Sequence, residues 1–129
     1  MKKKVLYLQE ISPFNDWFIV ECGKTRREIE AFAKKHFTND TLKRFRNSLD
    51  GSFSNEKDTN GRVHYDTSNT VWVLEFKEIR DDWKFYDTLL HEVVHIVDIV
   101  SRRFSIENEF EFRAYLTENL FRSIRKKIS

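Results

Sequence analysis

The residues best suited to chemistry in this sequence are His91, Glu92 and His95, which form the pattern His-Glu-x-x-His. On an α-helix the two histidines lie one turn apart and about 40° from each other around the axis. Two imidazoles placed in this way can direct nitrogens at one metal ion about 2 Å away. Glu92 lies about 100° from His91, which suits a general base acting on water better than a metal ligand. The pattern therefore predicts a zinc site with a catalytic Glu92.

The segment around the pattern has the apolar spacing of a helix that begins after Asp81 or Asp82 and ends near Arg102. Its apolar positions cover most of its circumference, which predicts burial on more than one side. They are Phe85, Leu89, Leu90, Val93, Val94, Ile96, Val97 and Val100. Two histidines and a glutamate on such a helix are costly unless a metal or hydrogen bonds satisfy them. The alternative to a metal site is thus a pair of core histidines bonded to backbone or carboxylate groups.

The run 89–97 resembles the active-site helix of zincin metallopeptidases. Metzincins continue with a glycine and a third histidine, but Ser101-Arg102-Arg103 stands here instead. The gluzincin class remains, in which a glutamate from a following helix is the third ligand. Glu107, Glu109, Glu111 and Glu118 are the candidates. The segment 111–115, Glu-Phe-Arg-Ala-Tyr, resembles the Glu-x-x-Ala-Tyr segment of small phage-type zincin peptidases, which favours Glu111.

The resemblance implies a zinc-dependent metallopeptidase that hydrolyses peptide bonds. Zinc would be held by His91, His95 and Glu111, and a peptide or protein substrate would bind as an extended strand along the free edge of 70–76. Tyr115 could donate its hydroxyl to the reacting group, with core packing as the alternative reading. Asp98, one turn after His95, could hydrogen-bond a liganding histidine, or could be a surface carboxylate without a role.

Other classes of protein are compatible with parts of the sequence. Peptide deformylases share the His-Glu-x-x-His pattern, but their cysteine ligand lies in Glu-Gly-Cys, whereas Cys22 lies in Glu-Cys-Gly. A catalytically inactive zincin-like module for binding or structure remains open. A nucleic-acid-associated protein with a structural metal is supported only by basic clusters near the two ends. His64 and Cys22 have no partner at a functional spacing.

Composition limits the classes of protein to which this sequence can belong. The 129 residues carry a net charge of +2, which is too small to indicate nucleic acid by itself. One cysteine excludes an internal disulfide, and neither a signal peptide nor a membrane span is predicted. We expect one zincin-like metallopeptidase domain over 1–129, without membrane association, in the cytoplasm of a bacterial or phage-infected cell.

The predicted elements give an α+β fold. The resemblance implies a zincin-like form of it, with a small mixed sheet packed against the His-Glu-x-x-His helix and a C-terminal helix. A polar, turn-rich loop is predicted over 50–62, and a capping box, Thr25 with Glu28, opens the first helix. The predicted strands are 5–8, 17–20, 63–65 and 70–76, and the predicted helices follow Thr25, span 40–48, span 82–102 and begin at Ser105.

Overall fold

The apolar runs and helical stripes of the sequence form four strands and four helices in the computed structural model, which describes residues 3–50 and 60–129. The predicted α+β class is confirmed, and so is the order of the elements. In sequence they are β1 (Val5–Ile11), β2 (Asp16–Cys22), α1 (Arg26–His36), α2 (Asn39–Asp50), β3 (Gly61–Tyr65), β4 (Val71–Phe76), α3 (Trp83–Arg103) and α4 (Phe110–Ile128).

Local signals fix where the helices begin. The side chain of Thr25 accepts a hydrogen bond from the amide of Glu28, and the Glu28 carboxylate accepts one from the amide of Thr25, so the predicted capping box is present. Asp82 caps α3 by accepting from the amide of Phe85 at 2.9 Å. The last helix begins at Phe110 and not at the predicted Ser105, which has a φ of 57° in the turn after α3. A left-handed residue cannot continue a right-handed helix.

The sheet has the strand order β1-β2-β4-β3. β2 and β4 are parallel, while β1 pairs antiparallel with β2 and β3 pairs antiparallel with β4. The expectation that 70–76 offers a free edge is therefore wrong, because β2 and β3 occupy both edges of β4. In the described part of the chain the edge strand on this side is β3. Most of the predicted loop, 51–59, lies outside the described residues, and its last residues, Gly61 and Arg62, belong to β3.

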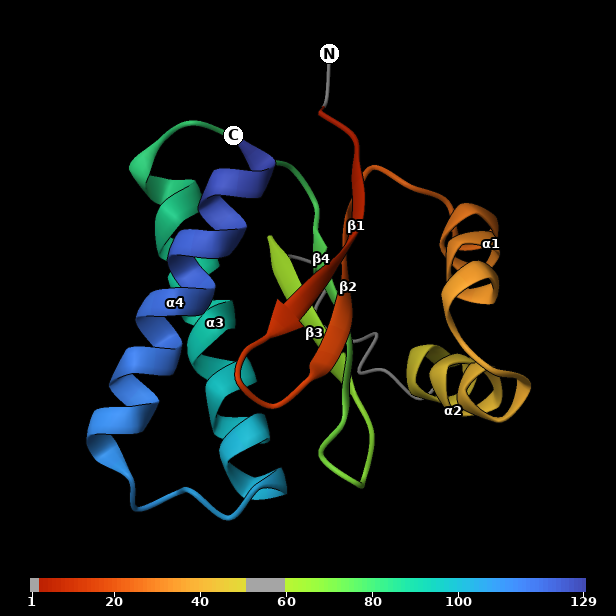
Figure 1. Ribbon diagram of the computed structural model, residues 1–129. Helices are drawn as coiled ribbons and strands as arrows, with labels where there is room; N and C mark the ends of the chain where they lie inside the picture. The colour runs from red at the N-terminus through yellow and green to blue at the C-terminus, as the bar shows by residue number, and fades with distance from the viewer. Residues whose placement is uncertain (1–2, 51–59) are drawn as a thin grey trace.

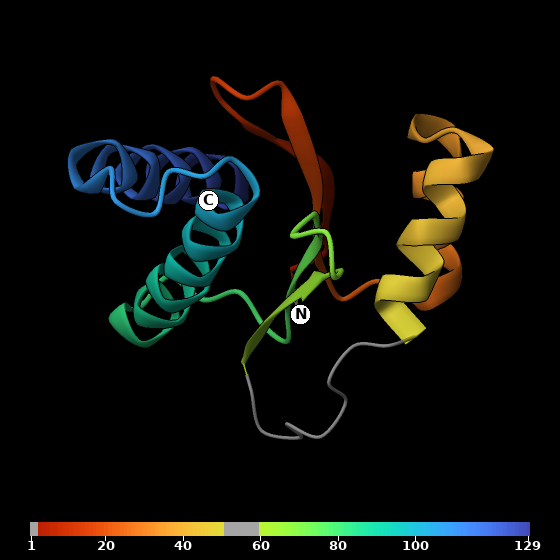
Figure 2. The same cartoon turned by 90° about the horizontal axis from the view of Figure 1, so that it is seen from below.

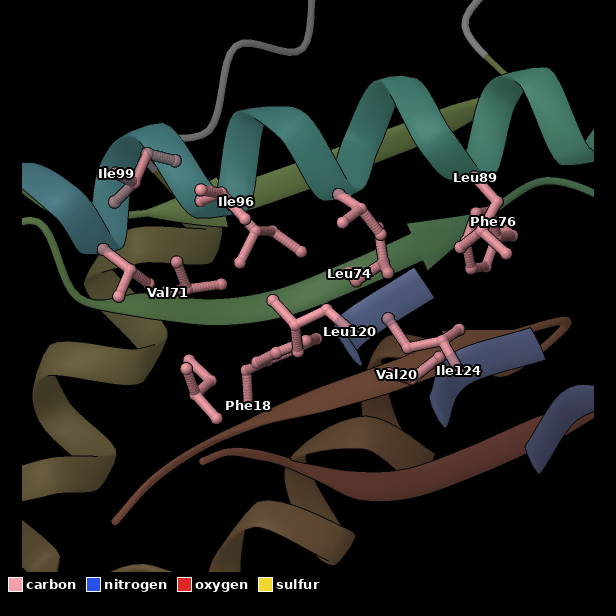
Figure 3. Packing of buried hydrophobic residues seen from close by; sticks show 14 of the residues in the cluster. Phe18, Val20, Val71, Leu74, Phe76, Leu89, Ile96, Ile99, Leu120 and Ile124 are labelled. Atoms are coloured by element: carbon pink, nitrogen blue, oxygen red, sulfur yellow. The ribbon is translucent and has the colours of Figure 1, made fainter. Parts of the chain in front are cut away.

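Helices cover both faces of the sheet, with α3 and α4 on one face and α1 and α2 on the other (Figures 1 and 2). The larger hydrophobic cluster lies between the sheet and the pair α3 and α4. Within it Leu89 of α3 lies beside Phe76 of β4 and Ile96 points toward the same strand, while Leu120 of α4 belongs to the same cluster (Figure 3). Burial of this apolar surface holds α3 against the sheet.

A smaller cluster lies on the opposite face, beneath α1 and α2. It includes Ile29 and Ala33 of α1, Phe45 of α2, and Trp72 and Val73 of β4. β4 is therefore buried on both faces, which explains its nearly continuous apolar sequence.

One face of α3 is open to solvent. Leu90 is 45% exposed and Val94 is 44% exposed, so not every apolar position of this helix is buried. The prediction that the helix is buried on more than one side is confirmed, because it packs against both the sheet and α4. α4 and the sheet cover the faces that carry Leu89, Val93, Ile96 and Val100. Within the described residues, no helix combines the length and the apolar character that crossing a membrane requires.

Candidate functional site

The two histidines of the motif face solvent together from the middle of α3. Their Nε2 atoms are 3.1 Å apart, and both side chains are exposed. Two zinc–nitrogen bonds of about 2.0–2.1 Å at a tetrahedral angle would place the nitrogens about 3.3–3.4 Å apart. The observed separation is close to this value. The alternative reading of the pair as core histidines is wrong, because neither imidazole is buried.

Glu92 is the buried member of the motif, with 7% of its surface exposed. It lies one residue further around α3, where the helix meets the first residue of β3. Gly61 makes this approach close: a Cβ at that position would lie 2.9 Å from the Glu92 Cγ and 3.1 Å from the Thr88 Cγ2. Glycine therefore allows β3 to pack directly beside the glutamate.

A cleft of about 570 Å3 runs between α3 and β3, and all three motif residues line it. Residues 60–63 and Tyr65 form the side of the cleft that belongs to β3 and to the residue before it. On α3 the lining residues recur with helical spacing, so they form one stripe along the helix. Besides the motif these are Asp87, Thr88, Asp98, Ile99 and Arg102.

Asp98 lines the cleft one turn beyond His95, as its spacing predicts. Its carboxylate accepts a hydrogen bond from the Nη2 of Arg113 on α4 and forms an ion pair with that guanidinium. Arg113 also donates to the carbonyl oxygen of Glu107. Asp98 therefore connects α3 to the start of α4, and its partner is Arg113 and not a histidine of the motif.

Glu111 is exposed and does not line the cleft. Arg113, which contacts Asp98, lies two residues further along α4, so Glu111 is about 200° away around that helix. Phe110, the residue before Glu111, is 73% exposed. Across residues 3–50 and 60–129, no three His, Cys, Asp or Glu side chains stand together as a metal-binding group. The two imidazoles fit zinc, and a third protein ligand is not in place beside them.

Tyr115 is 59% exposed and lies in a different groove. Its neighbours there include Gln9 of β1 and Ser123 of α4, whose side chains hydrogen-bond each other at 3.0 Å. The structure does not bring Tyr115 to the cleft that holds the histidines. The alternative of core packing is also incorrect, because most of the side chain is exposed.

Three titratable residues lie together within the sheet, one on each of three adjacent strands. Glu21 of β2 pairs in register with Glu75 of β4, and the His64 Nε2 of β3 is 3.7 Å from a Glu75 oxygen. Burial, and then the charge of Glu75, raises the pKa of Glu21 to about 8, whereas the nearby His64 lowers the pKa of Glu75. Cys22 is buried in the larger cluster. None of these residues lines the cleft.

Several cleft residues were not singled out from the sequence. Asp87, Thr88 and Arg102 are on the face of α3 that carries the histidines, and helical spacing alone could have identified them. Gly61 and Tyr65 come from β3, whose position beside α3 depends on the order of the strands. Comparison with protein-family models, with curated proteins and with solved structures finds no match for this chain.

Proposed function

We propose that this protein is a zinc-dependent metallopeptidase of the zincin type, with its active site in the cleft between α3 and β3. The observation that carries the proposal is the pairing of the His91 and His95 Nε2 atoms at 3.1 Å, with Glu92 beside them in the same cleft. Zinc, when bound by the two imidazoles, would lower the pKa of a coordinated water and polarise the scissile carbonyl.

In this proposal each residue of the motif has a distinct task. His91 and His95 bind the metal through Nε2. Glu92 accepts a proton from water at the floor of the cleft and passes it to the leaving amine. Its low exposure favours this task, because a carboxylate held in a confined site is already oriented for proton transfer.

The substrate in this proposal is a peptide or protein segment in extended form. β3 is the strand that supports it, since it lines the cleft and is the edge strand of the sheet over the described residues. An extended segment can pair with the backbone of such a strand. The side chains of Val63 and Tyr65 are available to contact it, because both residues line the cleft.

Glu111 remains our proposal for the third ligand, on the basis of the Glu-x-x-Ala-Tyr resemblance. Its exposed position requires the first turn of α4 to reorient when metal binds. The cap residue Glu109 makes no side-chain cap hydrogen bond, and Phe110 is largely exposed, so few contacts hold the beginning of this turn. Its last residue, Arg113, is bonded to Asp98, and the reorientation would have to keep or replace that contact. Tyr115 would act only if the same rearrangement moved it into the cleft.

A second candidate function is a zincin-like module that binds a partner without catalysis. The position of Glu111 outside the cleft favours it, because a catalytic zinc site normally has three protein ligands. The deciding experiment measures zinc per chain in protein purified without added metal, together with cleavage of a fluorescence-quenched peptide library. Stoichiometric zinc with cleavage that is lost in Glu92→Gln supports the peptidase. Zinc without cleavage supports the module.

A further inference from the structure

The cleft carries one unpaired charge near each end of its α3 stripe. Asp87 lies one turn before His91, and Arg102 lies two turns after His95. Within the described residues, Asp87 has no ion pair or hydrogen bond from its side chain, and Arg102 has no carboxylate partner. Three other arginines do have one: Arg44 pairs with Asp66, Arg103 with Asp16, and Arg113 with Asp98.

Arg102 is held in place although it is not neutralised. Its Nε donates to the Oδ1 of Asn69 at 3.4 Å. Asn69 is part of the turn between β3 and β4, in which its amide donates to the carbonyl oxygen of Asp66. The contact leaves the two terminal nitrogens of Arg102 without a partner in the described part of the chain. These nitrogens form the fork that binds a carboxylate with two parallel hydrogen bonds.

We infer that Arg102 is a specificity-determining residue that selects substrates with a carboxylate at its end of the cleft. The inference rests on the proposed peptidase function and adds a substrate class to it. The negative charge nearest to Arg102 on its own helix is Asp98, which Arg113 already neutralises. Asp87 favours a positive group at the opposite end.

The distance between Asp87 and Arg102 along α3 predicts how far apart the positive group and the carboxylate lie in the substrate. Fifteen residues separate Asp87 from Arg102, which is about 22 Å along a helix. An extended peptide covers this distance with about seven residues at roughly 3.3 Å each. Arg102 lies about 13 Å along the axis from the midpoint of the two histidines. The carboxylate therefore belongs about four residues from the bond that is cleaved.

The test uses four fluorescein-labelled heptapeptides that end in either Glu or Gln, each with a free or an amidated C-terminus. Binding is measured by fluorescence anisotropy and by NMR shifts of the Arg102 and Asn69 amides, and cleavage is measured as kcat/KM. We expect the Glu peptides to bind about ten-fold more tightly than the Gln peptides, as for a charge-assisted hydrogen bond. If Glu is still preferred over Gln in the amidated peptides, the site binds an acidic side chain. If peptides with a free terminus bind more tightly than amidated ones whichever residue is last, the site binds a C-terminal carboxylate.

Arg102→Glu should abolish the preference and favour a matched peptide ending in Lys. Lys43→Glu is the control, because it changes the net charge equally at an exposed position on α2, against the other face of the sheet. Carboxylate-dependent binding without cleavage would uphold the role of Arg102 while the peptidase proposal fails. Cleavage without a carboxylate preference, equal loss in both variants, or no binding of any of the peptides would overturn the inference.

Discussion

Gly61 and Glu92 are in contact where β3 crosses α3, and a Cβ on Gly61 would lie only 2.9 Å from the Glu92 Cγ. The Cγ is near the base of a buried side chain and cannot move aside freely. Gly61→Ala should therefore displace either the strand or the glutamate and cost about 1–3 kcal/mol of unfolding free energy. Peptide cleavage should fall while zinc content is kept. Unchanged stability and activity in a urea titration and a cleavage assay would show that this contact is not needed.

Removal of one histidine should remove the metal. His91→Ala leaves a single imidazole, so we expect zinc to drop from about one per chain to a trace. Chelation should lower the Tm of the wild type by a few degrees, since a metal that binds only the folded state stabilises it. His91→Ala should not respond to the chelator. His36→Ala is the control, because His36 is exposed on α1 and distant from the cleft in sequence and layer.

Glu92→Gln should separate metal binding from catalysis. Glutamine keeps the volume of the buried side chain but cannot accept a proton, so zinc content and fold should persist while kcat falls by at least about 100-fold. Glu118→Gln, at an exposed position on α4, serves as the control. If the Glu92 variant instead loses zinc, then Glu92 is a ligand and the assignment of Glu111 fails.

Loss of a residue that only hydrogen-bonds to a metal ligand weakens metal binding roughly 10–100-fold. Glu111→Ala should weaken zinc binding by more than this, because Glu111 is proposed to bind the metal itself. Glu107→Ala and Glu118→Ala should have little effect. Since Glu111 is exposed in the structure, zinc should also slow amide hydrogen exchange in the first turn of α4 in the wild type but not in the variant. Equal zinc affinity of wild type and Glu111→Ala would exclude the residue as a ligand.

Glu21 should make the protein less stable as the pH rises from about 5 to 8. Its pKa is raised to about 8 by burial and by Glu75, so the folded state keeps a proton that the unfolded chain has released. The unfolding free energy therefore declines as the pH rises from the pKa of Glu21 in the unfolded chain to its raised pKa in the folded protein. Above both pKa values it is constant. The pKa of Glu75 is lowered, so Glu75 makes the unfolding free energy rise with pH, and this rise occurs at more acidic pH than the decline caused by Glu21.

Glu21→Gln should remove this decline, and the variant should equal or exceed the wild type in stability at pH 8.5. Urea unfolding at several pH values from 5 to 9 measures the effect, for which one unit of pKa shift corresponds to about 1.4 kcal/mol. Glu10→Gln, exposed on β1, is the control. An identical pH profile in the wild type and Glu21→Gln would contradict the assignment.

The sequence was sufficient for the order of the elements because their signals are local. Thr25 with Glu28 and the cap at Asp82 act within one helical turn, and the spacing of His91 and His95 on a helix fixes their separation. The order of the strands was not predictable in this way, because β3 reaches the edge beside α3 through pairing with β4. The edge was therefore assigned to the wrong strand, and the part of the cleft formed by Gly61 and Tyr65 was missed.

The orientation of α4 was the other property that local pattern did not determine. The apolar residues of α4 did not determine how the helix is rotated about its axis, and the pairing of Arg113 with Asp98 accompanies the rotation that is observed. The helical spacing of residues within α3 or within α4 does not reveal an ion pair between the two helices. The Glu-x-x-Ala-Tyr resemblance favoured Glu111, but it did not determine the face of the helix on which Glu111 lies.

The unequal hydrophobic clusters on the two faces of the sheet imply different local unfolding energies. Among the described residues, the cluster beneath α1 and α2 contains seven buried side chains, and the one beneath α3 and α4 contains eighteen. Helices that bury less apolar surface detach at a lower free energy. Transient detachment of α1 and α2 would admit water to their face of β4, while α3 keeps its packing against the other face. We therefore expect α3, which carries His91 and His95, to exchange its amide hydrogens more slowly than the other helices.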